Sequence, residues 1–350
     1  MFVTVAVHGE LDLRMNLLTD YVKWFVLFLF VQASLDTEAS LRGIVRVLVF
    51  LSLVLGIEGI QHYMNDIGWA GQTLGWVSEG AKGRTRWVGI FDGPGVFCVV
   101  YTIALPFTIH YYFTAKGKAF KGLAVIATGI LSVAIFFNGS RGGFLAALSI
   151  IIGYVIFKSK NKSAIIFGAI LVAVLFMAAP SHMTNVSDKQ HSTSHRVEMW
   201  AYGCDMFKSN PIFGVGRGGF QQHSGSLIAH NSFIEIMAET GFIGLFLWAG
   251  LLYTNLKGLA AACVLEDEVS RALALPLTLC IIGYLVSAFF VTLEYETLYF
   301  LLALSAAFAK HVGIDSRLDG SDYKRILAII VTFIVVINVF VIFLGPSAFQ

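Results

Sequence analysis

Charged residues are scarce in this sequence. Only 13% of its 350 residues are Asp, Glu, Lys or Arg, whereas a soluble domain carries roughly 25%. Hydrophobic residues make up 57%, and Phe alone occurs 30 times. So few charges leave too little polar surface to cover a water-facing globule, so lipid must be the main solvent of the chain. The composition therefore excludes a soluble enzyme and indicates an integral membrane protein.

Basic runs and metal-binding cysteine patterns are also lacking. The net charge is +2 and no basic segment is long enough to predict a nucleic-acid partner. The four cysteines show no CxxC or metal-ligand spacing. Cys98, Cys263 and Cys280 lie in apolar stretches and are expected in the core, and Cys204 stands alone in a polar segment. Without repeats or a second soluble domain, residues 1–350 are predicted to form a single integral membrane domain.

Long apolar runs dominate what is present. A spanning helix needs about 20 apolar residues, and about ten runs qualify. The sequence therefore predicts an all-α, polytopic transmembrane helical bundle. The predicted spans are 21–35, 41–60, 94–113, 119–137, 142–157, 163–180, 232–254, 272–292, 295–311 and 325–344.

Lysine and arginine gather in alternate links between these spans, which sets the orientation by the positive-inside rule. The basic links, expected in the cytoplasm, are 114–121, 158–162, 255–271 and 310–325. The opposite face then receives 61–93, 138–143, the long loop 181–230 and 293–296. The polar segments most able to support chemistry are therefore predicted on the outer face.

Arg141 lies in one of these outer segments, the polar turn Asn138-Gly139-Ser140-Arg141-Gly142-Gly143. Arginine at membrane depth is costly unless it is paired or faces a polar cavity. An arginine at a helix end also snorkels to the interface without any further role. Gly142 and Gly143 would let a ligand approach the backbone closely. For Arg141 alone, both interpretations are open.

The loop 181–230 contains a second candidate, Arg196. The residues Arg196, Trp200 and Cys204 recur at the spacing of one helix face. Asn210-Pro211 is expected to end that helix.

A literal GxGxxG follows at Gly214, Gly216 and Gly219. That motif binds a dinucleotide only when it follows a strand in a βαβ unit, and no strand is predicted here. We predict a glycine-rich turn that shapes a cleft.

His230-Asn231 stands directly before the span 232–254. The positive end of the helix dipole disfavours a charged imidazolium, so a neutral imidazole could accept a proton from a hydroxyl. A lone histidine at a membrane interface is also commonly a packing or capping residue. Gly241 and Gly244 are predicted to let a neighbouring helix pack closely.

Two arginines and one histidine are thus predicted on one face of the membrane. Arginine stays charged and binds phosphate oxygens with a planar fork, so Arg141 and Arg196 suit a diphosphate. No carboxylate-rich cluster on this face resembles a divalent-metal site, so neither a metal nor a cofactor is expected. Glu235, Glu239, Glu294 and Glu296 are expected to pair with arginines.

Two non-enzymatic classes compete with this interpretation. A glycolipid transporter or flippase would place polar residues inside the spans and break helices in matching halves. These spans hold few ionisable groups, Glu58 being the main one. A membrane scaffold would leave the grouping of Arg141, Arg196 and His230 unexplained.

The motifs in combination resemble those of the O-antigen ligase and polymerase superfamily. They are NGSRGG at 138–143, R-x-x-M-W at 196–200, NPIFGVGRGGF at 210–220 and HN-x9-GxxG from His230 to Gly244. The segment TRWVGIF at 85–91, followed by Pro94, is also similar to that family. The resemblance covers roughly 84–250, about the central half of the chain.

The resemblance implies a metal-independent, inverting glycosyltransferase of the multi-span, GT-C-like architecture in the bacterial inner membrane. Its active site would face the periplasm, with part of it on the loop 181–230. The donor would be a glycan on undecaprenyl diphosphate, the acceptor a lipid or glycan, and the surroundings membrane lipids. Arg141 and Arg196 would hold the diphosphate and His230 would activate the acceptor hydroxyl. Further candidates on the diphosphate side are Arg86, Arg217 and Asn231.

Three enzymatic versions stay open at this point: an O-antigen ligase, a repeat-unit polymerase, and an O-linked protein oligosaccharyltransferase. They share the donor chemistry and differ only in the acceptor, for which the sequence has no legible pocket.

Overall fold

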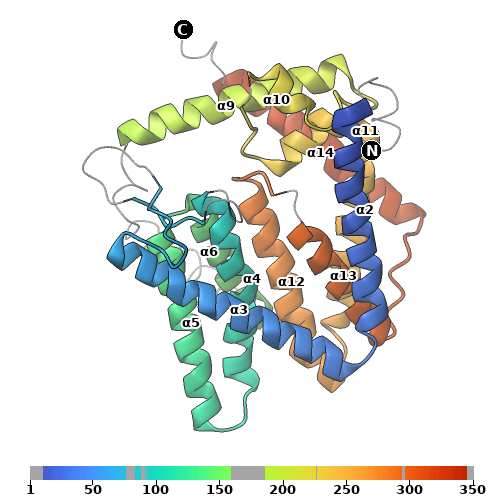
Figure 1. Cartoon of the computed structure of the whole chain (residues 1–350). Coiled ribbons are helices and arrows are strands. Elements are labelled where there is room, and N and C mark those ends of the chain that lie inside the picture. Colours follow the sequence, from blue (N-terminus) through green and yellow to red (C-terminus); the bar gives the residue numbers. More distant parts are fainter. Residues whose placement is uncertain are drawn as a thin grey trace. The chain divides into compact units, whose positions relative to one another are not determined.

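A computed structural model describes residues 11–75, 83–87, 91, 93–158, 186–225, 227–293 and 296–344. Helices dominate these residues, which confirms the predicted all-α class. The only β pairing within the described ranges is a set of isolated bridges, Ile67–Thr73, Gly75–Arg84 and Trp87–Phe91. The helices are α2 (Leu11–Ser34), α3 (Glu38–Asn65), α4 (Pro94–Thr114), α5 (Lys118–Asn138), α6 (Arg141–Lys158), α9 (Val186–Ser209), α10 (Gly219–His223), α11 (Ser232–Ala262), α12 (Glu268–Ala288), α13 (Glu296–His311) and α14 (Gly320–Leu344) (Figure 1).

Each predicted span that falls on described residues coincides with a helix, whereas the predicted span 163–180 lies outside them. Within the described part, six helices are long and apolar enough to cross a membrane: α3, α4, α5, α11, α12 and α14. Shorter apolar helical stretches occupy Tyr21–Ser34 and Arg141–Phe157. The chain is therefore a multi-pass helical membrane protein.

Local sequence signals start several of these helices. The Thr37 hydroxyl accepts a hydrogen bond from the backbone N–H of Ser40, and the Ser40 hydroxyl in turn binds the backbone of Thr37. Pro94 begins α4 directly after Gly93, where a missing N–H has no cost. The Asp267 carboxylate caps α12 through the Ser270 N–H at 2.9 Å.

The chain divides into two compact units. Unit 1 comprises Met1–Ser34, Gln190–Gly258 and Val291–Gln350. Unit 2 comprises Leu35–Lys189 and Leu259–Phe290.

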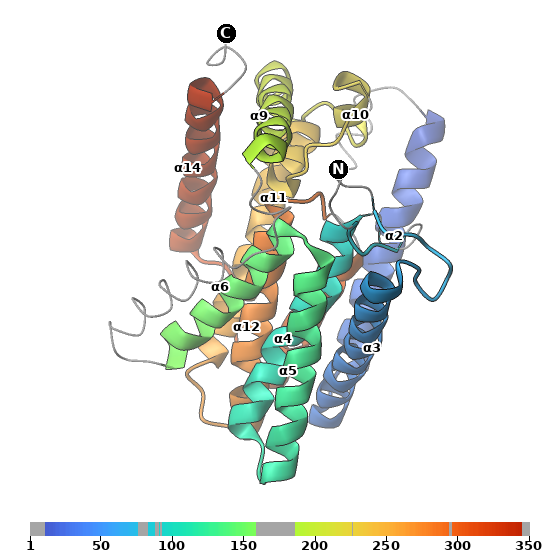
Figure 2. The same ribbon diagram turned by 90° about the vertical axis from the view of Figure 1, so that its left-hand side faces the viewer.

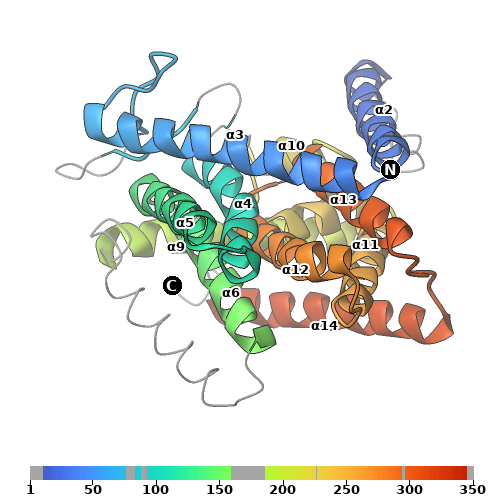
Figure 3. The same ribbon diagram turned by 90° about the horizontal axis from the view of Figure 1, so that it is seen from below.

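Unit 2 is built around α4, which packs against α3, α5, α6 and α12. Figure 2 shows α4 and α5 side by side, joined through a short link, and Figure 3 shows α6 beside α12. The core of this unit includes Phe97, Tyr101, Leu131 and Ile150, all almost completely buried. The apolar windows of α4 and α12 are 67% buried, but that of α5 is only 22% buried. The exposed apolar side of α5 is therefore suited to lipid.

Unit 1 holds α2, α10, α13, α14 and most of α9 and α11. Helix α2 packs along α13, where the Trp24 and Tyr299 rings stack at 5.1 Å (Figure 1). Helix α11 is tied to α14 by a hydrogen bond of 2.9 Å from the Tyr253 hydroxyl to the buried Asp322. The candidate residues Arg196, Arg217, His230 and Asn231 all belong to this unit.

Candidate active site

Helix α11 is not continuous. Gly241 adopts φ 63° and ψ −163°, which separates a segment of nine residues, 232–240, from the longer helix that follows. Such a break exposes backbone groups that must find partners at membrane depth. The sequence pattern predicted one span here, so the break is a feature that the prediction missed.

The glycine-rich turn supplies those partners. The Val215 N–H donates to Ala238 O at 2.9 Å and the Gly216 N–H to Glu239 O at 3.0 Å, so the end of the first segment is capped. On the other side of the break, the Phe242 N–H donates to Pro211 O at 2.8 Å and the Ile243 N–H to Ile212 O at 3.3 Å. Residues 211–216 thus replace the helical hydrogen bonds lost at Gly241.

Close contacts explain why positions 241 and 244 are occupied by glycine. A Cβ on Gly241 would lie 2.5 Å from Gly214 N and from Ile212 O. The prediction that Gly241 admits a neighbouring helix was therefore wrong, because the close partner is the turn. A Cβ on Gly244 would instead meet Thr240 of the same chain segment.

Glu239 fixes the second half of the turn. This carboxylate is almost fully buried and accepts hydrogen bonds from Arg217 Nη1 at 2.9 Å, Gly218 N at 2.8 Å and Phe220 N at 3.3 Å. The expectation that Glu239 pairs with an arginine is confirmed. Arg217 is engaged in this ion pair, with 17% of its side chain exposed.

His230 lies at the start of α11 in a left-handed conformation, with φ 50°. Non-glycine residues rarely adopt this conformation. The next residue, Asn231, is completely buried, and its Oδ1 accepts hydrogen bonds from Phe233 N at 3.0 Å and Ile234 N at 3.3 Å. Asn231 is therefore the N-cap of α11, and His230 is held directly at the positive end of that helix.

Arg196 lies on α9, whose helical course over Arg196–Cys204 and end at Ser209 confirm the predicted pattern. One turn along from Arg196, the Trp200 indole donates to Ala229 O at 3.1 Å. Ala229 directly precedes His230. Arg196 and His230 therefore belong to the same neighbourhood of unit 1.

Arg141 and Arg86 belong to unit 2. Arg141 is the first residue of α6, and the Ser140 hydroxyl accepts a hydrogen bond from Gly143 N at 3.2 Å. The Asn138 amide donates to Thr85 O at 3.2 Å, which brings Arg86 to the turn that carries Arg141. Arg86 in turn donates from Nε to Thr73 O at 3.3 Å. The turn at 138–143 is thus tied to the backbone next to Arg86, whereas the Arg86 side chain contacts the hairpin at Thr73.

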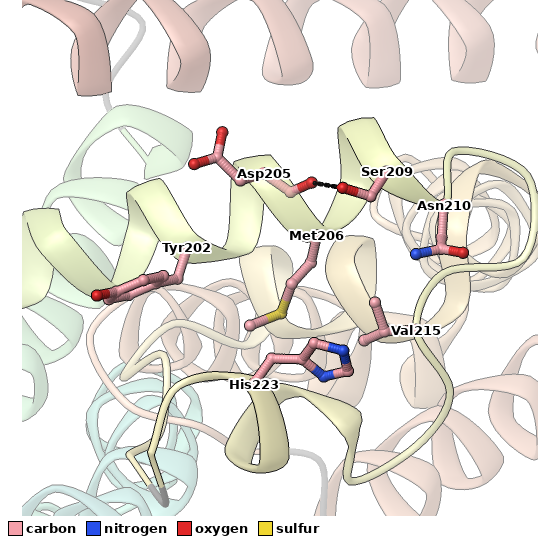
Figure 4. Close-up of a pocket in the computed structure, with 7 residues that line it drawn as sticks. All are labelled: Tyr202, Asp205, Met206, Ser209, Asn210, Val215 and His223. Carbon is pink, nitrogen blue, oxygen red and sulfur yellow. Dashed lines mark hydrogen bonds between the residues drawn. The ribbon is translucent and has the colours of Figure 1, made fainter.

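Unit 1 also contains an open hollow of about 290 Å³ between α9 and α10. Figure 4 shows Met206, Val215 and His223 facing one another beneath α9. Its lining is Tyr202, Asp205, Met206, Ser209, Asn210, Val215 and His223, none of which is a predicted site residue. Within the described ranges, no three His, Cys, Asp or Glu side chains lie where they could hold a metal ion.

Sequence reasoning missed two contributors that act through the backbone. Trp200 and Glu235 both interact with the backbone of Ala229, next to His230. The signal for Glu235 was present as an acidic residue inside an apolar helix, one turn from its N-cap.

The structure is that of a multi-pass helical membrane protein with polar residues at helix N-termini in both units. Comparison with known proteins finds a family match over part of the chain. Residues 126–249 match the family described as O-antigen ligase, so this segment of the chain is similar to that family. The segment contains Arg141, Arg196, Arg217, His230 and Asn231 but not Arg86.

Two rickettsial relatives match a similar share of the chain. A Rickettsia prowazekii (strain Madrid E) protein, provisionally named a polysaccharide ligase, is 30% identical over 146 residues. A Rickettsia typhi (strain ATCC VR-144 / Wilmington) protein with the same provisional name is 28% identical over 146 residues. Each alignment covers 36% of this chain and 35% of the relative's length. The chain therefore spans about a third of the relatives that it matches.

Proposed function

We propose that this chain transfers a glycan from undecaprenyl diphosphate to an acceptor hydroxyl at the periplasmic face of the bacterial inner membrane. One observation supports the proposal most strongly. Within the segment that matches the ligase family, α6 begins at Arg141 and α11 begins directly after His230-Asn231. Helix N-termini attract anions, and an arginine adds a fixed charge.

The proposed roles follow from the chemistry of each residue. Arg141 and Arg196 bind phosphate oxygens of the donor and stabilise the departing diphosphate. Arg86, tied to the Arg141 turn through Thr85, supports the donor side. Arg217 has its partner in Glu239, so we assign it to the maintenance of the turn rather than to direct contact with the donor.

In the proposed reaction, the acceptor oxygen attacks the anomeric carbon of the glycan. A new C–O bond forms as the bond from that carbon to the diphosphate breaks, so the configuration inverts. The acceptor proton passes to the imidazole of His230, and undecaprenyl diphosphate leaves as the anion. Arginine charge and helix dipoles would stabilise that anion without a metal ion.

The acceptor decides between ligase and polymerase. The relatives' name, polysaccharide ligase, favours the attachment of a finished glycan to a final acceptor. A polymerase would use the same donor chemistry but would extend a chain on the lipid carrier. Because both make the same bond type, the products of a deletion strain separate them.

The test is a gel profile of surface glycans and lipid-linked glycans from a deletion strain complemented with the wild-type chain or with His230→Ala. We expect the wild-type chain to restore the surface glycan. The His230→Ala strain should accumulate long chains on the lipid carrier, because the acceptor hydroxyl loses its base. Equal membrane levels of the two proteins, measured by immunoblot, are the control.

Two results would change the conclusion. A normal surface glycan from His230→Ala would remove the role of base from His230. Single repeat units with no ladder anywhere would identify a polymerase instead of a ligase.

A further inference from the structure

His230 is followed by a completed N-cap, but its unusual backbone conformation also needs support on its N-terminal side. That support comes from Ala229, whose backbone interacts with two side chains. The Trp200 indole N–H donates to Ala229 O at 3.1 Å. The carboxylate of Glu235, one turn into α11, also lies close enough to the Ala229 backbone to interact with it. We call this arrangement of Trp200, Ala229 and Glu235 the Ala229 clamp.

The clamp is rigid because its two side chains are themselves anchored. Glu235 is 5% exposed and its Oε2 accepts a hydrogen bond from the Thr292 hydroxyl at 2.7 Å. Trp200 is 8% exposed and its ring packs against Phe340 of α14, with centroids 5.6 Å apart. Neither side chain can shift far without loss of these contacts.

A second tie holds the same turn of α11. The Ser232 hydroxyl donates to Val291 O at 3.1 Å and accepts from Leu293 N at 2.7 Å. Residues 291–293 therefore pack against the start of α11 through both Ser232 and Glu235. The His230 turn is thus fixed from α9, from α11 and from the segment before α13, all within unit 1.

We infer that Glu235 and Trp200 are positioning residues that hold His230 in its left-handed conformation through Ala229. The inference rests on the proposed role of His230 as the base. With the clamp intact, the imidazole keeps one direction relative to the helix N-terminus. Without it, the Ala229 peptide turns and the imidazole loses its alignment with the acceptor hydroxyl, although donor binding by the arginines is unaffected.

The test uses variants that remove one contact at a time from the full chain. Glu235→Ala removes the carboxylate, whereas Glu235→Gln keeps an oxygen for the Ala229 backbone and a polar group for Thr292. Trp200→Phe removes the indole donor but keeps an aromatic ring against Phe340. Thr240→Val is the matched control, because Thr240 is buried in the same nine-residue segment and its hydroxyl binds only Ile236 O of its own helix.

Transfer is measured in membrane vesicles from the complemented deletion strain, with the purified lipid-linked glycan added over a range of concentrations. We expect Glu235→Ala to lower kcat roughly 10- to 100-fold, the cost of a small misplacement of a catalytic group. The KM for the lipid-linked glycan should stay within about twofold, because ground-state donor binding is intact. Glu235→Gln should recover most of the rate, Trp200→Phe should fall between, and Thr240→Val should match the wild type.

A double variant separates positioning from general damage. If Glu235 acts through His230, Glu235→Ala should lower the residual rate of His230→Ala no further. A further drop of similar size, a raised KM with unchanged kcat, or an equal loss in Thr240→Val would each overturn the inference. A fully active Glu235→Ala beside an inactive His230→Ala would overturn the positioning alone. A fully active His230→Ala would overturn the proposed base and the positioning together.

Discussion

Glu239 shows how a single carboxylate can organise a turn inside a membrane protein. Its two oxygens collect a guanidinium and two backbone N–H groups from residues 217–220. A carboxylate in such a site costs free energy to bury, and the three donors offset that cost only when all are present. The glycine-rich turn therefore depends on Glu239 more than on any of its own side chains.

This dependence predicts unequal effects when the ion pair is cut from either side. Glu239→Ala leaves Arg217 and two buried N–H groups without their acceptor and should cost about 3–5 kcal/mol. Arg217→Ala should cost less, because the Gly218 and Phe220 N–H groups still bind the carboxylate. The measurement is the fraction of detergent-solubilised protein that stays monodisperse after heating.

The matched control for this prediction is the exposed pair Lys208–Asp205, whose side chains lie 3.1 Å apart and are 60% and 71% exposed. Lys208→Ala should lower the free energy of unfolding by no more than about 1 kcal/mol, so its heating profile should stay close to that of the wild type. Profiles for Glu239→Ala and Lys208→Ala that coincide would contradict the structural role given to Glu239.

The two acidic residues of this segment also show the limit of prediction at the residue scale. Both were expected to pair with arginines, and Glu239 does so. Glu235 binds instead the Thr292 hydroxyl and interacts with the Ala229 backbone. A pairing rule based on charge finds opposite charges, but hydroxyl and backbone donors from a distant segment leave no charge signature in the sequence.

At the scale of the element, the break in α11 is the feature that most affects the site. Its first segment presents His230 and Asn231, and its second segment continues as the long apolar helix. Because the turn at 211–216 satisfies the backbone on both sides of Gly241, the two segments keep a fixed relation. Backbone complementarity, rather than side-chain packing alone, therefore sets the direction of the His230 turn.

A methyl group at the break should be far more damaging than one elsewhere in the helix. Gly241→Ala places a Cβ 2.5 Å from Ile212 O and Gly214 N, at a φ of +63° that alanine rarely adopts. We expect little folded protein and no transfer activity. Gly250→Ala, in the same helix with no atom within 4 Å of its added Cβ, should fold as the wild type does. Membrane yield and size-exclusion profiles measure both.

Equal membrane yields of Gly241→Ala and Gly250→Ala would contradict the conclusion that the helix is interrupted at Gly241 and packed there against the turn. The comparison is sharp because both variants make the same chemical change in one helix. Only the local backbone conformation and the nearness of the turn differ.

The contrast between the spans and the break follows from the range of the interactions. Apolar runs such as 94–113 and 119–137 predict helices directly, because lipid leaves no other way to pair the backbone. The break at Gly241 depends on a partner turn nearly 30 residues upstream, and SFIEIMAETGFIGLF reads as one apolar helix. The Asn138–Thr85 bond, which brings Arg86 to the Arg141 turn, is likewise a contact between distant segments with no local pattern.

At the scale of the whole molecule, the charge pattern of the links bears on orientation. In unit 2, the hairpin at 66–75 precedes α4 in the sequence, and the link between α4 and α5 follows that helix. If α4 crosses the membrane, the two segments belong to opposite faces. The second of these carries Lys116, Lys118 and Lys121. The positive-inside rule predicts that this link lies in the cytoplasm and the hairpin in the periplasm, where Arg86 and Arg141 would meet a periplasmic donor.

Cysteine accessibility can test this orientation with two variants of unit 2. Ala70→Cys places a thiol on the exposed hairpin, and Ala119→Cys places one on the exposed first turn of α5. A membrane-impermeant maleimide applied to intact spheroplasts should label Ala70→Cys at once. Ala119→Cys should be labelled only after lysis, because the bilayer keeps the reagent from the cytoplasmic link.

The three buried native cysteines, Cys98, Cys204 and Cys280, should give little background in this experiment, and Cys263 is partly exposed. Cys98 and Cys280 are buried, and burial raises the pKa of the Cys204 thiol to about 11. The thiolate is the reactive form and its fraction rises with pH up to the pKa, so at pH 7 Cys204 should react roughly 300-fold more slowly than an exposed cysteine. The unsubstituted chain measures that background. Labelling of Ala119→Cys but not Ala70→Cys in intact spheroplasts would reverse the orientation and place the Arg141 turn in the cytoplasm, away from a periplasmic donor.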